Sequence, residues 1–490
     1  MRKIALILAL ATAFSMIFFV GCSCNSCNKT ALTSYDISID FDDENMLITG
    51  SESVCYYNAT DNVLDALKFN IFPNAFRQGA VYKPISDAQT HSAYYNGESF
   101  GDMAISAVFC GENPLVFNIV GEDENVLKVE LLEDIYPEES VEIKILFSVK
   151  LANVLSRTGY NDKTVNLGNF YPILCTYDSA DGFNECLYYS YGDPFCSSVA
   201  NYRVSITLDD EYAVASSGQL VKKDSKNGRS SYEYSLEKAR DFAFVLSTEY
   251  EMLFEEVDGV TVNYYYHSDK APKMSLDTAV KALKTFNNLF CKYPYSTYSV
   301  CETGFNEGGM EYPGLVMISD DINEQISYQE VIVHETAHQW WYSLVGNDEI
   351  KYGFLDEGLT EYSTVLFFEN NPEYGLTRDS LIKIAKSTYS TYCSVYEKVF
   401  GDKDTTMLRA LPEYSGAYEY VNIAYVKGAL MFDYLREGLG DELFYKGLKK
   451  YANDYSYSLA TPDCLVGAFE SVGANTNAFF KSWFNGEVII

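Results

Sequence analysis

Basic side chains are scarce in this sequence relative to acidic ones. The 490 residues contain 36 lysines and arginines against 69 aspartates and glutamates, which gives a formal net charge of −33. Such a surface repels the phosphates of nucleic acids and of anionic lipid head groups, so binding to either is disfavoured. The preferred interpretation is that the excess negative charge keeps the protein soluble. The alternative is that it attracts cationic substrates.

The sequence also lacks the features of disordered and repetitive chains. Apolar residues make up 47% and aromatic residues 15% of it, which is enough for sizeable cores, and no repeat of fixed period is present. The length predicts two to three domains.

The apolar run at the N-terminus is short for a membrane span. Seventeen largely apolar residues follow Met1-Arg2-Lys3, whereas a spanning helix needs about 20. This pattern predicts a signal peptide over residues 1–21, and Gly21-Cys22 resembles the cleavage box of bacterial lipoproteins. The expectation is a lipid on Cys22, a polar tether over 22–33 and an extracytoplasmic protein anchored at the bacterial cell membrane. An ordinary cleaved signal, which would give a secreted protein, and an uncleaved anchor are the alternatives.

A second closely spaced cysteine pair is missing after Cys24-x-x-Cys27, which argues against a zinc finger. Nine of the twelve cysteines lie beyond these N-terminal ones, and an odd number cannot all pair with one another. Disulfides are allowed outside the cytoplasm, but the connectivity is not predictable from the sequence.

Two kinds of pattern divide the rest of the chain. Segments such as YDISIDFD and VEIKILFSV alternate apolar and polar residues, which predicts an all-β domain over 34–250. After residue 251 helical spacing dominates, which predicts a mainly helical domain over 251–490. Helices are expected at 329–345, 356–369, 377–396, 424–437 and 442–451, besides the periodic segment LDTAVKALKTFNNLF.

Histidine is rare, yet two of the four histidines lie close together. His334 and His338 are four residues apart in VIVHETAHQWW, so on a helix both imidazoles point to one place. A catalytic zinc takes three protein ligands and a water, and Glu335 would lie beside that water as general base. The pattern H-E-x-x-H therefore predicts one zinc per chain, with a helix whose histidines merely pack as the alternative. The other two histidines, His91 and His267, are expected to be structural.

A third ligand is offered by Glu357 in the segment GFLDEGLTEY. Eighteen residues separate it from His338, which is enough to end one helix, turn and begin another. Alternatively, Glu357 could be a carboxylate that only interacts favourably with the positive end of a helix dipole. Glu361 follows one turn later and could orient a ligand imidazole, or be a plain surface acid.

These motifs resemble the aminopeptidase N family of gluzincin zinc peptidases. The family combines H-E-x-x-H, eighteen residues and Glu with a G-x-M-E-N box upstream, which is matched here by GGMEY, and with a later tyrosine segment, matched by AYVKGAL. The resemblance implies that Glu311 contacts the α-amino group of a peptide substrate, with Gly309 and Met310 of the same box facing substrate. It also implies that Tyr425 stabilises the oxyanion.

The family resemblance spans roughly residues 34–486 and has two departures. Tyr312 stands where the family usually has Asn, which affects the geometry around Glu311. The sequence ends with AFFKSWFNGEVII, so no large C-terminal helical domain is expected. The implied fold is α+β and multidomain: an N-terminal all-β domain and a thermolysin-like, mainly helical catalytic domain.

The function expected from these observations is removal of N-terminal residues from peptides through a zinc-activated water. The partners expected are peptides with a free N-terminus, and no nucleic acid. Three alternatives remain: a zinc endopeptidase of the same fold, a catalytically inactive surface lipoprotein that binds peptides, and an adhesion or solute-binding lipoprotein in which the motif is accidental.

Overall fold

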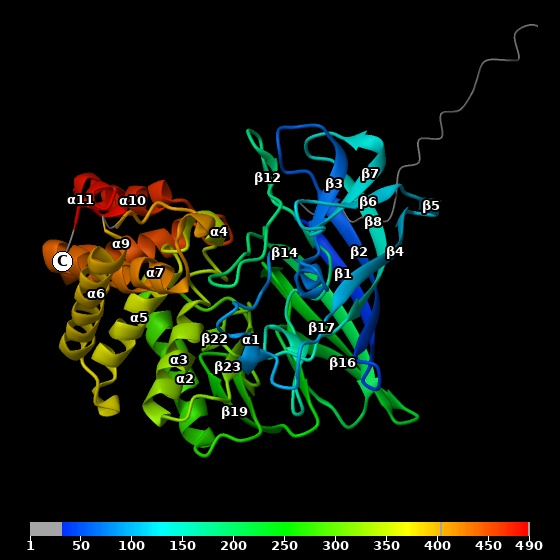
Figure 1. Ribbon diagram of the computed structural model, residues 1–490, viewed down its shortest axis with the longest axis horizontal. Helices are drawn as coiled ribbons and strands as arrows, with labels where there is room; N and C mark the ends of the chain where they lie inside the picture. The colour runs from blue at the N-terminus through cyan, green and yellow to red at the C-terminus, as the bar shows by residue number, and fades with distance from the viewer. Residues whose placement is uncertain (1–31, 402–403, 489–490) are drawn as a thin grey trace, which may run out of the picture.

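The computed structural model describes residues 32–401 and 404–488, in which a β region precedes a mainly helical region (Figure 1). This combination confirms the fold class predicted from the sequence. Among the described residues no helix is long and apolar enough to cross a membrane. The expected signal peptide, Cys22 and nearly all of the tether lie outside the described residues.

The β region is built around an eight-stranded sheet. Strand β1 (Ser34–Asp42) pairs with β2 (Leu47–Tyr57) in antiparallel and with β14 (Ala200–Asp209) in parallel orientation. Alternate β1 residues are buried, as the sequence pattern predicted, because successive side chains of a strand face opposite sides of the sheet. The sheet continues through β16 (Gln219–Lys226), β17 (Arg229–Ala239), β8 (Ser140–Lys150), β4 (Asp102–Cys110) and β5 (Asn113–Pro114).

Smaller sheets complete the β region. One has the order β15-β18-β10-β9, another β11-β3-β7-β6, and a third pairs β12 with β13. Their bounds are β15 (Ala213–Ser216), β18 (Phe244–Ser247), β10 (Val165–Leu167), β9 (Thr158–Tyr160), β11 (Ile173–Leu174), β3 (Leu64–Asn70), β7 (Val126–Ile135), β6 (Phe117–Val120), β12 (Tyr177–Asp178) and β13 (Gly182–Phe183).

A five-stranded sheet opens the second region, in the order β19-β20-β21-β23-β22. Strands β20 (Val260–Tyr266), β21 (Thr297–Thr303) and β23 (Leu315–Ser319) are parallel, while β19 (Glu251–Val257) and β22 (Gly309–Met310) lie antiparallel at the two edges. The short edge strand β22 belongs to the GGMEY segment.

Helices cover this sheet and form the rest of the region, seen from green to red in Figure 1. The helix of the H-E-x-x-H motif, α3, packs against α2, β23 and α5. The helices are α2 (Pro272–Leu289), α3 (Gln325–Ala337), α4 (Glu349–Tyr352), α5 (Glu357–Asn370), α6 (Arg378–Phe400), α7 (Ala417–Tyr420), the π-helix η4 (Val421–Lys427), α8 (Gly428–Leu439), α9 (Asp441–Asp454), α10 (Pro462–Ser471) and α11 (Asn477–Phe484), with α1 (Thr90–Ala93) in the β region.

Helix α3 ends eight residues earlier than predicted. The chain turns after Ala337, and the N–H groups of Ser343 and Val345 donate to the carbonyls of His338 and Trp340 at 3.0 Å each. The turn places both tryptophans of the segment in the core, where Trp340 is 0% and Trp341 is 1% exposed. Apolar residues that suggested a longer helix therefore fill the core from a loop.

The two regions share one hydrophobic core and are joined by buried polar contacts. Arg240, at the start of the loop after β17, is 1% exposed. Its guanidinium donates to the carbonyl oxygens of Tyr342 at 2.9 Å, Ser197 at 2.8 Å and Ser458 at 2.5 Å. Each of the three guanidinium nitrogens thus donates a hydrogen bond. These bonds connect the β region to the loop that follows α3.

Candidate functional site

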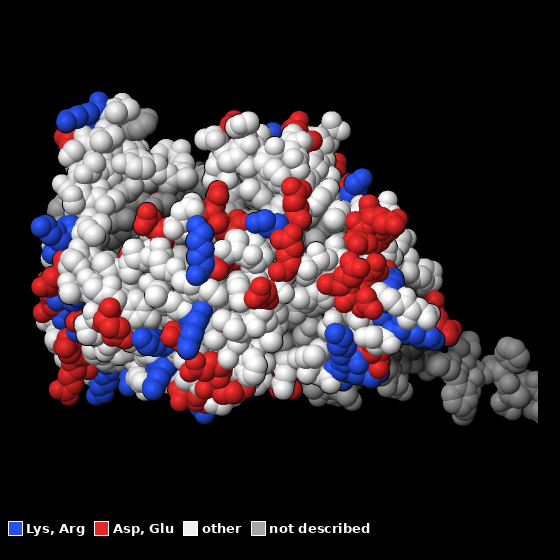
Figure 2. Space-filling view, turned by 90° about the horizontal axis from the view of Figure 1, so that it is seen from below, with Lys and Arg blue, Asp and Glu red and all other residues white. Residues whose placement is uncertain are grey.

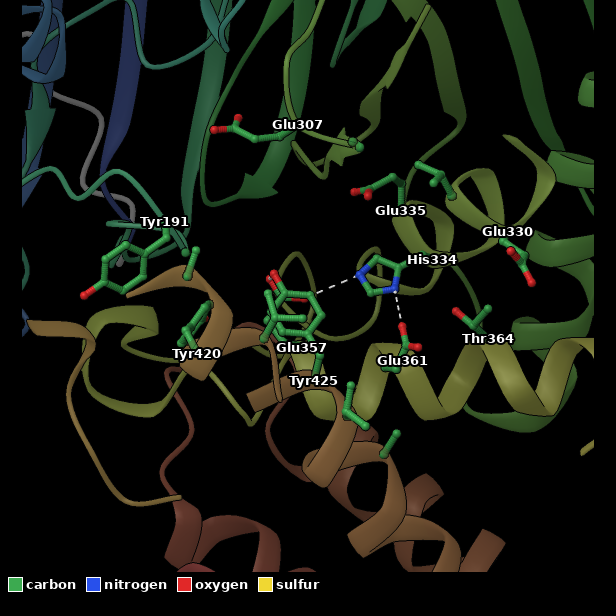
Figure 3. Close-up of a pocket in the computed structure, with 18 of the residues that line it drawn as sticks. Tyr191, Glu307, Glu330, His334, Glu335, Glu357, Glu361, Thr364, Tyr420 and Tyr425 are labelled. Atoms are coloured by element: carbon green, nitrogen blue, oxygen red, sulfur yellow. Dashed lines mark hydrogen bonds and ion pairs between the residues drawn. The ribbon is translucent and has the colours of Figure 1, made fainter. Parts of the chain in front are cut away.

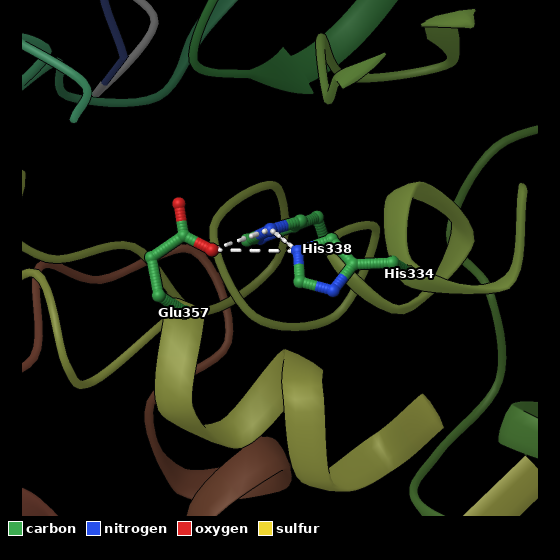
Figure 4. A group of neighbouring side chains, drawn as sticks. All are labelled: His334, His338 and Glu357. Atoms are coloured by element: carbon green, nitrogen blue, oxygen red, sulfur yellow. Dashed lines mark hydrogen bonds and ion pairs between the residues drawn. The ribbon is translucent and has the colours of Figure 1, made fainter. Parts of the chain in front are cut away.

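Three side chains from two neighbouring helices bring one atom each to a common point (Figure 4). His334 lies in the last turn of α3, His338 caps that helix, and Glu357 is the first residue of α5. The Nε2 atoms of the two histidines are 3.2 Å apart, and Oε2 of Glu357 lies 3.4 Å from His334 Nε2 and 3.3 Å from His338 Nε2. The three predicted ligands thus form a nearly equilateral triangle of donor atoms.

The triangle fits a zinc ion. Bonds of about 2.0–2.1 Å in tetrahedral geometry separate ligand atoms by about 3.3–3.4 Å, which matches the observed spacing. Oε2 of Glu357 is buried and accepts no hydrogen bond from the described residues, so a cation would satisfy it. Two imidazoles and one carboxylate are also the ligand types of many catalytic zinc sites.

Hydrogen bonds on the far side of the imidazoles set their orientation. Nδ1 of His338 lies 2.9 Å from the carbonyl oxygen of Trp341, and Nδ1 of His334 lies 3.2 Å from Oε2 of Glu361. A proton on each Nδ1 leaves the Nε2 lone pairs directed at the centre of the triangle. Glu361 is therefore placed to orient a ligand, as the sequence suggested.

The charges of the triangle are strongly coupled. Burial would raise the pKa of Glu357, but the adjacent imidazoles of His338 and His334 outweigh it and hold that pKa below its usual range. Burial would lower the pKa of His334, but its contacts with Glu357 and Glu361 raise it to about 10. A metal ion that binds here must displace these imidazole protons, because ligating nitrogens are unprotonated.

Glu335 faces the same cavity from the metal helix without joining the triangle. It is 5% exposed, and its Oε2 accepts no hydrogen bond from the described residues. Burial raises its pKa to about 7, with His334 and His338 acting in the opposite direction. Its carboxylate fits closely over the edge strand β22: a Cβ added at Gly309 would lie 2.3 Å from Oε1 of Glu335. Gly309 thus leaves the space that Glu335 occupies.

Glu311 follows β22 directly and lines the same cavity. It is 4% exposed with an unpartnered Oε1, and one of its carboxylate oxygens lies within 4.8 Å of ligand atoms of Glu335 and His338. Burial raises its pKa well above the usual range. A buried carboxylate in this state favours a cationic ligand.

Tyr425 reaches the triangle from the π-helix η4. Its hydroxyl donates to Oε1 of Glu357 at 2.6 Å, and its ring lies parallel to the His334 ring, 6.1 Å between centroids. Two glycines allow this approach: a Cβ on Gly358 would lie 2.8 Å from Cα of Gly428, and one on Gly428 would lie 2.7 Å from Cα of Gly358. Helix α5 and the start of α8 therefore touch through their backbones, next to Glu357 and Tyr425.

Comparison with known proteins agrees with this geometry. Residues 274–483 match the peptidase family M1 domain. The chain resembles the M1 aminopeptidases. It is 28% identical over 250 residues to aminopeptidase N of Lactobacillus delbrueckii subsp. lactis, a match that covers 46% of this chain and 28% of that protein. It is 25% identical over 307 residues to aminopeptidase M1-D of Oryza sativa subsp. japonica, covering 58% of this chain and 34% of that protein.

The chain thus spans about a third or less of the curated M1 relatives it matches. Among solved structures, the M1 zinc metallopeptidase from Deinococcus radiodurans superposes with a TM-score of 0.65 over 94% of this chain and 95% of that chain, at 16% identity. Another structure of that protein is described as bound to a Tyr-Ser-Ala substrate, with the same TM-score, identity and coverage. These matches show that both regions together adopt the M1 metallopeptidase fold.

A cavity of about 900 Å³ contains the site of this M1 fold and extends to both sides of it (Figure 3). The triangle, Glu335, Glu311 and Tyr425 all line it. Figure 3 draws Glu307 and Tyr191 on one side of His334, and Glu330 and Thr364 on the other. The cavity is long enough to extend past the metal triangle in two directions.

Four charged residues of the cavity were not predicted: Arg157, Asp193, Glu307 and Glu330. Asp193 comes from the loop before β14, and one of its oxygens lies within 4.8 Å of oxygens of Glu311 and Glu357. Nη1 of Arg157, which is 6% exposed, lies 2.6 Å from Oδ1 of Asp193. Neither residue belongs to a recognisable local motif, because both reach the cavity from loops of the β region.

Met310 and Tyr312 do not line the cavity. Met310 is 1% exposed, whereas Gly309 beside it does line the cavity, and the substrate-facing role expected of Met310 stays a prediction. Tyr312 is fully buried and donates from its hydroxyl to Oδ1 of Asn169 at 2.7 Å. Tyr312, which stands where the family usually has Asn, thus links the Glu311 segment to the β region through this hydrogen bond.

His91 and His267 do not line the cavity. His91 is an exposed residue of α1, and His267 is buried with its Nε2 3.6 Å from a carboxylate oxygen of Asp320. Both lie outside the site, as the sequence suggested.

Proposed function

We propose that this protein is a zinc-dependent aminopeptidase that removes N-terminal residues from peptides. The observation that carries the proposal is the triangle of His334, His338 and Glu357 with two further buried carboxylates, Glu335 and Glu311, facing the same cavity. The names of the curated relatives and of the solved structures support the same activity.

His334, His338 and Glu357 would hold one zinc ion per chain. Zinc supplies a Lewis acid that polarises the scissile carbonyl and increases the acidity of a water molecule. Glu335 takes a proton from the attacking water and passes it to the leaving amine, since its unpartnered oxygen faces the cavity.

Tyr425 and Glu311 act on the substrate. The Tyr425 hydroxyl, which donates to Glu357 at 2.6 Å, turns to donate to the developing oxyanion. Glu311 pairs with the α-ammonium group of the substrate, which brings the first peptide bond to the triangle. The edge strand β22 lies beside the bond and offers backbone groups to an extended peptide.

The test compares a free peptide with its N-acetylated form, with and without a chelator, by mass spectrometry. Acetylation removes the ammonium charge and leaves the peptide bonds unchanged, so the free peptide is expected to lose residues stepwise while the acetylated form persists. Internal fragments formed equally from both would show an endopeptidase. Binding without cleavage would show an inactive peptide-binding protein, and no binding of zinc or peptide would show an accidental motif.

We also propose that the protein works outside the cytoplasm, attached to the membrane through lipid on Cys22. The support is the N-terminal sequence alone, which lies outside the described residues. Metabolic labelling with a radioactive fatty acid, followed by membrane fractionation, tests it. Label and membrane association should both be lost in Cys22→Ala, and an unlabelled, released wild-type protein would show an ordinary secretion signal.

A further inference from the structure

Glu307 is a carboxylate of the cavity that has no role in the chemistry just described. Glu307 lines the cavity two residues before β22, and its side chain is 29% exposed. Its Oε2 is buried and accepts no hydrogen bond from the described residues. The nearest cation is Arg157, whose Nη2 lies 3.8 Å away, beyond hydrogen-bonding distance.

The charges around Glu307 do not balance. Among the described residues that line the cavity, Arg157 is the one lysine or arginine. Its Nη1 is already engaged by Asp193 at 2.6 Å, and its guanidinium lies over the ring of Phe195, 5.2 Å from the centroid. The Arg157–Asp193 pair is neutral, so no cation among the described residues of the cavity lies within hydrogen-bonding distance of Glu307 or of the unpartnered oxygen of Glu311.

Both carboxylates come from one short segment. Glu307 and Glu311 flank the edge strand β22, and Figure 3 draws Glu307 on the side of His334 that is opposite Glu330 and Thr364. The first side chain of the substrate is joined to the same carbon atom as the α-ammonium group that Glu311 holds, and Glu307 lies only four residues before Glu311. Tyr189 and Tyr191 also line the cavity and offer apolar surface to a long methylene stem.

We propose that Glu307 selects peptides whose first residue carries a cationic side chain, arginine or lysine. The inference rests on the proposed aminopeptidase function and names its substrate class. The first residue of such a peptide carries two positive charges, which match the two unpaired carboxylates. Burial raises the pKa of Glu307, with Arg157 acting in the opposite direction, and a cation close to it would favour the charged form.

The surface of the protein is compatible with such substrates. Acidic side chains form broad groups on the face shown in Figure 2, with smaller basic groups between them. With a net charge of −33, the long-range field attracts cationic peptides.

The test uses pairs of fluorogenic aminoacyl amides that differ in charge but hardly in shape: arginyl against citrullyl, and lysyl against norleucyl. The wild-type protein is expected to show kcat/KM at least about tenfold higher for the charged member of each pair, as a charge-assisted hydrogen bond supplies. In Glu307→Gln the ratio should fall to within about twofold of unity, mostly through slower cleavage of the charged amides.

Glu330→Gln is the matched control. It removes the same charge from the same cavity on the other side of His334, and it should keep the wild-type ratio. Turnover of the neutral amides shows that each variant is folded. A wild-type ratio near one, or an unchanged ratio in Glu307→Gln, would overturn the inference while leaving the aminopeptidase intact. Failure to cleave any amide would overturn the proposed function instead.

Discussion

Replacing Gly309 with alanine tests how closely the edge strand and the general base fit together. The added Cβ would lie 2.3 Å from Oε1, 2.5 Å from Cδ and 2.6 Å from Cγ of Glu335, whereas ordinary contacts begin at 3.4 Å. The carboxylate must therefore move by about 1 Å. The end of a glutamate side chain can move without disturbing the core, so the cost in folding stability should stay within about 1–2 kcal/mol.

The catalytic cost of Gly309→Ala should be much larger than the structural cost. A misplacement of 1 Å at a reacting group costs on the order of 10²-fold in rate, so kcat should fall by about that factor. Zinc content should be unchanged, because the three atoms nearest the new methyl group all belong to Glu335 and none to a predicted ligand. Steady-state kinetics on an aminoacyl amide, metal analysis and thermal unfolding measure the three quantities.

Gly308→Ala is the control for the same backbone effect. A Cβ at Gly308 would meet only Cγ2 of Val331, at 3.8 Å, which is an ordinary contact. Its kcat should remain within about threefold of the wild-type value. Normal turnover in Gly309→Ala would refute the placement of Glu335 over β22, and a parallel loss in both variants would show that flexibility of the glycine pair matters instead.

Four further variants test individual side chains. Glu357→Ala should lose most of its zinc by metal analysis, because two histidines leave the site incomplete; full occupancy would contradict the ligand assignment. Glu335→Gln should keep zinc and lose about 10²-fold or more in kcat, so rapid turnover by the zinc-loaded variant would remove its role as base. Tyr425→Phe should lower kcat by about 10²-fold with KM changed far less, and a change in KM alone would point to substrate binding. Tyr312→Phe should destabilise the fold by about 1–3 kcal/mol in urea unfolding, since Asn169 loses a buried partner; an unchanged midpoint would contradict that contact.

The metal site was predictable because its information is local. Residues four apart on a helix share a face whatever surrounds them, so His334 and His338 could be paired from the sequence alone. Glu357 needed only a turn and a new helix start, and Asp356 does cap α5 by accepting from the Glu357 N–H at 2.9 Å. The end of α3 was wrong by eight residues, because a core can be filled from a loop as well as from a helix.

The cavity walls were less predictable because they depend on long-range packing. Arg157 and Asp193 lie in loops of the β region, and Asp193 comes close to Glu311 only when both regions pack together. The motif also names neighbouring residues without their orientation: a strand sends successive side chains to opposite faces, and of Gly309 and Met310 only Gly309 lines the cavity. Glu307 has no pattern of its own, and only its unpaired oxygen in the folded protein draws notice.

The backbone contact between Gly358 and Gly428 matters for deciding which related proteins are catalytically active and which are inactive. A methyl group on either glycine would push apart the two helical segments that carry Glu357 and Tyr425. A related protein could therefore keep every polar residue of these motifs and still lose catalytic activity through one Gly→Ala substitution. Sequence surveys that infer activity from the motif residues alone would classify such a protein as active. They should also check for glycine at positions 358 and 428.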